Sequence, residues 1–254
     1  MWRGNAWPAT LLIAGMVGYG LFISLSMTAW GDYKQLSTDP VFWESVGISL
    51  YVAVSSTVLS ILIGAGLAGF FARQTGWAAQ ILAVPLFLPH LGAAYLAILY
   101  LSDFPVIGPH EVNQFSIILT YLYKEIPFVF FYLLPVYRHL DHRYEELGLM
   151  LGLSRMKRFW HGKGVFLLFP VLEAAFIVFA FTLFAYEVPA LLGVTYPKLI
   201  GVYTFDLYMQ GDLSRQPEAF AISVLLTGIL FLLLLLFTRM IRPLTERISK
   251  GRIE

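Results

Sequence analysis

The sequence has no cysteine and few charged residues. Of its 254 residues only 13% are Asp, Glu, Lys or Arg, against about 25% in an average soluble domain. The absence of cysteine excludes disulfides and thiolate chemistry on this chain. The net charge of +1 gives no electrostatic reason to expect a nucleic-acid partner. The shortage of charge instead leaves apolar surface that has to face lipid.

Motifs of hydrolytic and nucleotide-binding sites are also missing. The sequence contains no HExxH, no GxSxG, no Walker A and no GxGxxG followed by an acidic residue. We therefore expect no enzyme, no cofactor and no ATP-binding site on this chain.

Long apolar runs dominate what is present. Hydrophobic residues make up 58% of the chain, and the mean hydropathy is +0.73. A bilayer core of about 30 Å needs about 20 apolar residues in a helix. Six segments meet this length, and they predict an all-α membrane protein with a single transmembrane domain over residues 1–254. The segments are 8–30, 45–71, 77–101, 115–137, 166–192 and 218–238.

The first segment has two interpretations. Arg3 before an apolar run is typical of a secretory signal, but the run at 8–30 is longer than a signal core and long enough to span a membrane. We expect a retained first helix.

The positions of prolines and tryptophans predict kinks within these segments and a membrane interface at their ends. Prolines lie inside three of the segments, the third, fourth and fifth, where they predict kinks. All six tryptophans fall at or beyond segment ends, as expected of an interfacial belt.

The basic residues predict the orientation. Most of the 17 Lys and Arg lie on one side of the predicted spans, densely at 138–163 and 239–252. Because cytoplasmic loops carry an excess of basic residues, we expect both termini in the cytoplasm. Residues 102–114 and 193–217 then form outer segments, and the second is long enough for a short helix at the membrane surface.

A charged island separates the fourth and fifth segments, at 138–165. Glu145 and Glu146 would begin a helix there, where the helix dipole favours negative charge. An apolar face follows at helical spacing, made of Leu147, Met150 and Leu151. Gly152 would end this helix with a positive φ, and Ser154 would cap a second, basic and aromatic helix. The sequence thus predicts a helix-turn-helix over 141–163 that docks on a soluble partner or, alternatively, lies on anionic lipid.

This island resembles the EAA loop in permease subunits of bacterial binding-protein-dependent ABC importers. The family pattern is Glu-Ala-Ala, three residues, Gly and, after a spacer, Ile-x-Leu-Pro. Glu146, Leu147 and Gly148 stand at the Glu-Ala-Ala positions, and Gly152 stands at the family glycine. The sequence departs from the pattern at Leu147, which replaces a small residue, and at Val165, which stands where the proline is usual.

The likeness extends over about residues 42–238, through the segments 42–73, 186–192 and 211–221. It implies the type I importer fold, with six spans and a cytoplasmic coupling helix-turn-helix between the fourth and fifth, in the inner membrane. The implied partners are two ATPase subunits that bind ATP and Mg²⁺, a second permease subunit, a periplasmic solute-binding protein and membrane lipid. The implied solute is a polyamine, thiamine, ferric iron or an organophosphonate. The implied ATPase-coupling residues are Glu145, Glu146, Gly148, Gly152, Ser154, Arg158 and Phe159.

Ionisable residues inside spans are costly and indicate a pathway or a partner. Lys124 and Glu125 lie near the middle of the fourth segment, and Glu187 lies near the end of the fifth. Neighbouring helical residues point about 100° apart, so Lys124 and Glu125 need not pair. Either Glu125 and Glu187 attract a cationic solute, or these groups make interhelical hydrogen bonds.

His90 also lies within a predicted span, after Pro89, and is a candidate for the pathway wall. A metal site would group it with Asp103, His110 and Glu111, but their spacing matches no ligand motif. We expect no metal.

Two other classes of function compete with the permease. A stand-alone channel or ion-coupled carrier would show discontinuous helices in repeated halves. An intramembrane enzyme would need a nucleophile and a base, and no such pair is evident.

Overall fold

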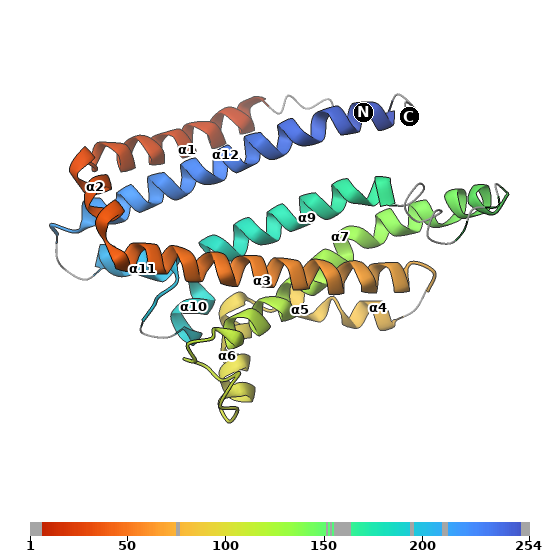
Figure 1. Ribbon diagram of the computed structural model, residues 1–254, viewed down its shortest axis with the longest axis horizontal. Helices are drawn as coiled ribbons and strands as arrows, with labels where there is room; N and C mark the ends of the chain where they lie inside the picture. The colour runs from red at the N-terminus through yellow and green to blue at the C-terminus, as the bar shows by residue number, and fades with distance from the viewer. Residues whose placement is uncertain are drawn as a thin grey trace. The chain divides into compact units, whose positions relative to one another are not determined.

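The computed structural model describes residues 7–74, 77–150, 152, 154, 164–193, 196–209 and 213–249. Across this part of the chain all regular structure is helical (Figure 1). Five described helices are long and apolar enough to cross a membrane, and a bent pair would supply a sixth crossing. The prediction of an all-α, membrane-type protein is therefore confirmed, while the expected count of six spans depends on the bent pair.

The chain divides into two compact units. One unit comprises residues 44–202. The other comprises residues 1–43 together with 203–254.

The unit of residues 44–202 is built around α7, Phe115–Met150. In the apolar window of α7, 61% of the residues are buried, more than in any other candidate span of the described chain. Helix α9, Val165–Phe184, runs alongside α7 in the opposite direction (Figure 1). Two apolar clusters form the core around α7. One surrounds Tyr121, and the other surrounds Phe130.

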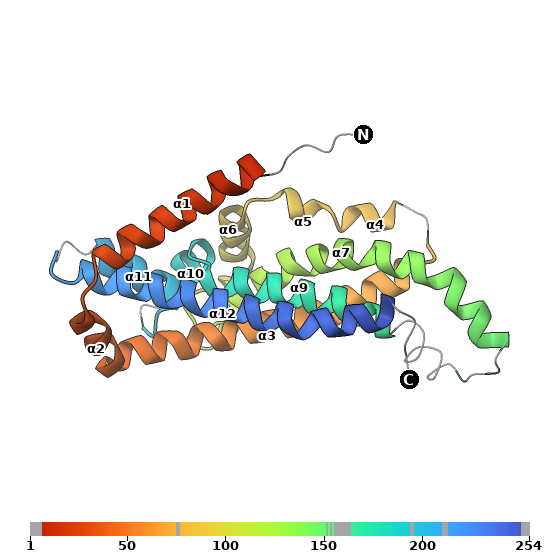
Figure 2. The ribbon, with the colours of Figure 1, turned by 90° about the horizontal axis from the view of Figure 1, so that it is seen from above.

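The other unit contains α1, Trp7–Ser26, α2, Trp30–Thr38, and α12, Gln216–Ser249. Helices α1 and α12 contact each other and converge toward the end where α1 finishes and α12 starts (Figure 2). No residue in the apolar window of α1 is buried within the chain, and only 11% are in that of α12. Exposed apolar helices of this length need lipid or another apolar surface around them.

The predicted third span, 77–101, is not one continuous helix. Helices α4, Ala78–Ile81, and α5, Val84–Phe87, are followed by α6, His90–Leu101. The axis bends by 103° between the two halves. Pro89 explains the break, because proline has no N–H and excludes the helical conformation from the residue before it. Leu88 is accordingly extended, with φ −80° and ψ 128°.

The predicted fifth span, 166–192, is also shorter in the structure. Helix α9 ends at Phe184, Ala185 is extended, and a separate short helix α10 spans Glu187–Leu192. Pro189 lies in the first turn of α10, where a proline costs no helical hydrogen bond. The sequence signal for this helix start was therefore present and was missed.

Two helices continue beyond their predicted ends. Helix α7 was expected to stop at 137 and to be followed by a separate helix from 141, but it continues to Met150. No glycine or proline lies between 137 and 147 to end it. Helix α12 likewise continues to Ser249 rather than 238.

Two sequence expectations about short features are confirmed. Gly152 follows the end of α7 with φ +63°, as predicted for a helix stop. The segment 193–217 contains a short helix, α11, Ile200–Met209. Its first N–H is satisfied by Ser49 on helix α3, Pro40–Phe71, because the Ile200 amide donates to the Ser49 hydroxyl at 2.7 Å.

Helices α3 and α7 approach closely at Gly64, which yields the first prediction. A Cβ at Gly64 would lie 2.7 Å from Cβ and Cγ1 of Val129. We expect Gly64→Ala to lower the thermal unfolding midpoint of the purified chain, through overpacking of about 1–3 kcal/mol. Gly66→Ala is the matched control, since a Cβ there meets no described atom within 4 Å. Equal midpoints for the two variants would contradict this close approach.

Candidate functional site

Backbone carbonyls at the break between α5 and α6 accept hydrogen bonds from a lysine side chain, although the Pro85 carbonyl also accepts from the Leu88 N–H at 3.3 Å. The Lys124 ammonium on α7 donates to the carbonyl oxygen of Pro85 at 2.6 Å and to that of Leu88. Lys124 is only 5% exposed. A cation at the carbonyl end of a helix is favourable. Lys124 therefore stabilises the broken backbone.

Glu125 faces a different partner from its neighbour. One of its carboxylate oxygens lies 3.7 Å from Nε2 of His90, the first residue of α6. The His90 ring also packs against Phe181 on α9, with 4.7 Å between the ring centroids. Glu125 is 7% exposed. The Lys-Glu dipeptide thus places a cation at the end of α5 and an anion at the start of α6.

The structure shows hydrogen bonds for Lys124, and the pathway role of Lys124 and Glu125 stays a prediction. Lys124 makes interhelical hydrogen bonds, and it does not pair with Glu125, as the helical spacing predicted. Glu125 lies too far from His90 for a hydrogen bond, because 3.7 Å exceeds the usual range. A buried carboxylate with one distant partner retains the capacity to bind another donor.

Tyr121 is a further member of this cluster that sequence reasoning missed. It lies one helical turn before Glu125 and is completely buried in the apolar core. Within the described chain its hydroxyl has no hydrogen-bond partner, and neither does the buried Nε2 of His90. The i, i+4 spacing of Tyr121 and Glu125 on one span was the available signal.

Glu187, the remaining predicted pathway residue, lies in the first turn of α10 and is exposed. The helix dipole favours a carboxylate at this position. Helix α10 contacts α6 and α7, the two helices that carry His90 and Glu125. The four predicted pathway residues therefore come from three mutually contacting helices of one unit.

The possible metal group at His90, Asp103, His110 and Glu111 does not form. His110 instead ties the loop before α7 to the end of α10, since its Nδ1 lies 2.8 Å from the carbonyl oxygen of Gly193. Its backbone N–H donates to the Leu192 carbonyl at 2.7 Å. Among the described residues no group of three or more His, Cys, Asp or Glu is placed to hold a metal ion.

The structure describes only some of the predicted coupling residues. Glu145, Glu146 and Gly148 lie in the last turns of α7. Gly152 follows them with its positive φ, and Ser154 is in an irregular segment. Arg158 and Phe159 lie outside the described residues.

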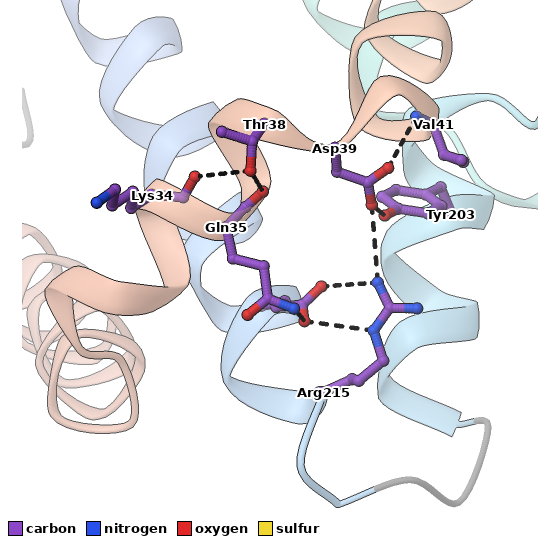
Figure 3. A network of polar contacts seen from close by, with 8 residues as sticks. Lys34, Gln35, Thr38, Asp39, Val41, Tyr203 and Arg215 are labelled. Carbon is purple, nitrogen blue, oxygen red and sulfur yellow. Dashed lines mark hydrogen bonds and ion pairs between the residues drawn. The ribbon is translucent and has the colours of Figure 1, made fainter.

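A second polar cluster joins α2, α11 and the starts of α3 and α12 (Figure 3). Arg215 donates to both carboxylate oxygens of Glu218, at 2.8 and 3.3 Å, and its Nη2 lies 3.7 Å from Asp39. Glu218 also accepts from Gln35 at 3.0 Å. Asp39 accepts from Tyr203 at 2.9 Å. We call these five residues the Arg215 network.

Asp39 has a second role as the cap of α3. Its other carboxylate oxygen accepts from the Val41 N–H at 2.9 Å, and Pro40 occupies the first helical position. Asp before Pro is a common helix start, so this cap was readable in the sequence although the rest of the Arg215 network was not.

The hydrogen bond to Glu218 raises the pKa of Arg215 above its ordinary value. Burial, and then the hydrogen bond to Asp39, raise the pKa of Tyr203 to about 12.

Comparison of the sequence with protein-family models and with curated proteins gives no match.

The Lys124 contacts predict the effect of losing the ammonium. We expect Lys124→Met to destabilise the chain by about 1–3 kcal/mol, because the part-buried hydrogen bonds to the carbonyls of Pro85 and Leu88 lose their charged donor. Thermal unfolding of the purified chain in detergent measures the effect. Lys34→Met is the control, since Lys34 is exposed and undergoes the same chemical change. A loss no greater at Lys124 than at Lys34 would contradict the stabilising role.

The Arg215 network predicts a dependence of stability on alkaline pH. The pKa of Tyr203 is about 12 in the folded chain and about 10 when unfolded. The contribution of Tyr203 to the free energy of unfolding is therefore complete below pH 10 and is lost as the pH rises from 10 toward 12. Tyr203→Phe should remove this part of the loss of stability at alkaline pH. The measurement is the unfolding midpoint as a function of pH. Tyr208→Phe, on the same helix, should retain the wild-type profile, and identical profiles for Tyr203→Phe and wild type would refute the assignment.

Proposed function

We propose that the chain is a permease subunit of a bacterial binding-protein-dependent ABC importer in the inner membrane. In this proposal it forms part of a translocation pathway for a small polar solute and performs no chemistry itself. Two cytoplasmic ATPase subunits bind ATP and Mg²⁺, a second permease subunit completes the pathway, and a periplasmic protein delivers the solute. The likeness of the charged island to the EAA loop suggests this class of function.

The observation that supports the proposal best is the course of α7. One helix carries Lys124 and Glu125 in the buried part of the unit and continues to Met150, at the charged island. Gly152 then turns the chain with φ +63°. A continuous helix between a polar interior cluster and a partner-binding loop is a suitable mechanical link.

The proposed mechanism is alternating access. ATP binding closes the two ATPase subunits, and the islands held in their surface clefts move with them. Helix α7 transmits this movement to the break between α5 and α6, because Lys124 holds the broken carbonyls. The pathway then opens toward the periplasmic binding protein.

The break between α5 and α6 also favours a second candidate, a stand-alone or ion-coupled carrier. Discontinuous spans are frequent at the binding sites of such carriers. Carriers usually contain them in pairs from repeated halves, whereas the described chain shows one bent pair of this kind.

Co-purification from the native membrane separates the two candidates. An importer subunit should retain an ATPase at one copy per permease subunit, measured by quantitative mass spectrometry of the purified complex. A chain that is active in liposomes without any ATPase would instead establish the carrier.

Gly152 provides a point test of the coupling. An L-residue with φ +63° costs about 1–2 kcal/mol unless it is Asn, which tolerates this conformation. We expect Gly152→Val to lose most of the retained ATPase or of the solute-stimulated ATP hydrolysis. Gly152→Asn should keep both close to wild type. If Gly152→Val equals Gly152→Asn in both measurements, the turn is not part of the coupling.

A further inference from the structure

The cluster of Tyr121, Glu125 and His90 contains two buried polar atoms without a hydrogen-bond partner in the described chain. One is the fully buried Tyr121 hydroxyl. The other is Nε2 of His90, and a carboxylate oxygen of Glu125 is 3.7 Å from it. Buried polar groups in native proteins are nearly always hydrogen-bonded. Two such atoms beside a buried carboxylate, on the contacting helices α6 and α7, therefore indicate a bound molecule that supplies donors.

The charge balance of the cluster favours a cation. Lys124 is the nearest basic residue in sequence, but its ammonium is committed to the carbonyls of Pro85 and Leu88. The neutral form of His90 carries no charge. Glu125, one helical turn after Tyr121 on α7, is 3.7 Å from Nε2 of His90, and Glu187 lies in the first turn of the contacting helix α10.

The geometry points to a primary alkylammonium group as the ligand. An ammonium of this kind has three N–H donors. Glu125, the Tyr121 hydroxyl and Nε2 of His90 can accept one each, provided that the imidazole carries its proton on Nδ1. The Phe181 ring against His90 supplies an apolar and aromatic wall, which favours an organic cation.

We propose that this cluster, which we call the ammonium site, binds the primary ammonium group of the transported solute. Glu187, at the start of α10, attracts the cation toward the site from its exposed position. The description of the ligand as the transported solute rests on the proposed function, whereas the binding of the ammonium group does not.

The test uses the full chain in phosphatidylcholine nanodiscs and two probes. Butylammonium has three N–H donors, and tetramethylammonium has the same charge and none. Binding to the folded state raises the unfolding midpoint in a concentration-dependent way. We expect butylammonium to raise the midpoint of the wild-type chain and tetramethylammonium, at equal ionic strength, to leave it unchanged. Equal effects of the two cations, or no effect of either, would overturn the proposal.

Two variants and one control assign the effect to the ammonium site. Glu125→Gln should weaken the apparent affinity for butylammonium by about tenfold or more, because a charged hydrogen bond is lost. Tyr121→Phe should weaken it about fivefold. Glu173→Gln is the control, since this exposed carboxylate on α9 accepts from Tyr132 at 2.8 Å and is not part of the site. Equal losses in Glu173→Gln and Glu125→Gln would overturn the assignment.

Tyr121→Phe keeps the test decisive if Glu125→Gln does not fold. The substitution removes a hydroxyl that bonds to no described residue, so we expect an unchanged or higher midpoint without ligand. Unchanged affinity in this variant would overturn the proposed role of the hydroxyl.

The importer proposal and the ammonium-site proposal can fail separately. An ATPase that co-purifies with a chain that binds no ammonium refutes only the ammonium site, and binding without any ATPase refutes only the importer.

Discussion

The hydrogen bonding of backbone carbonyls at a broken helix is the constraint on which the unit of residues 44–202 depends. Backbone carbonyls inside a membrane must be satisfied by the protein itself. At the break between α5 and α6 the Lys124 ammonium donates to the carbonyls of Pro85 and Leu88, and the Leu88 N–H also donates to that of Pro85. Because Lys124 is fixed by two hydrogen bonds, the position of α7 relative to the break is fixed as well. Glu125 then has to face another direction, toward His90 at the start of α6. Burial of a lysine is costly, and its two hydrogen bonds to backbone carbonyls offset part of that cost.

The two polar clusters of the protein differ in how completely their groups are partnered. In the Arg215 network, Glu218 accepts from both Arg215 and Gln35, and Asp39 accepts from Tyr203 and caps α3. A network with satisfied members rigidifies the structure and leaves little for a ligand to add. The cluster around Tyr121 retains acceptors without donors. The first arrangement is suited to holding helix ends together, and the second is suited to binding.

The sequence predicted the elements of this fold better than their ends and contacts. Hydropathy located every long helix, and the glycine at 152 predicted the stop after α7. The prolines at 77–101 predicted a kink, but a hydropathy window does not register how far the helix is interrupted before Pro89, where the axis bends by 103°. The ionisable residues of the candidate site were recognised by their position in apolar runs. The partners of Lys124 were not predictable, because they are backbone carbonyls about 36–39 residues away. Tyr121 was overlooked because a tyrosine in a span is usually core.

The prolines of α7 determine how this helix can transmit movement under the proposed function. Lys124 precedes Pro127 and Pro135, and the charged island follows both. From residue 124 to residue 150 the helix extends about 39 Å. Each proline removes one backbone hydrogen bond, so the segment between them bends more easily than the rest. Tyr132, within this segment, donates to Glu173 on α9. In the proposed mechanism a displacement of the island therefore has two effects. It bends α7 at 127–135, which moves α9, and it shifts α7 along its axis, which moves Lys124. The shift along the axis acts on the break between α5 and α6 through Lys124. The same contact therefore stabilises the polar cluster and transmits the proposed movement.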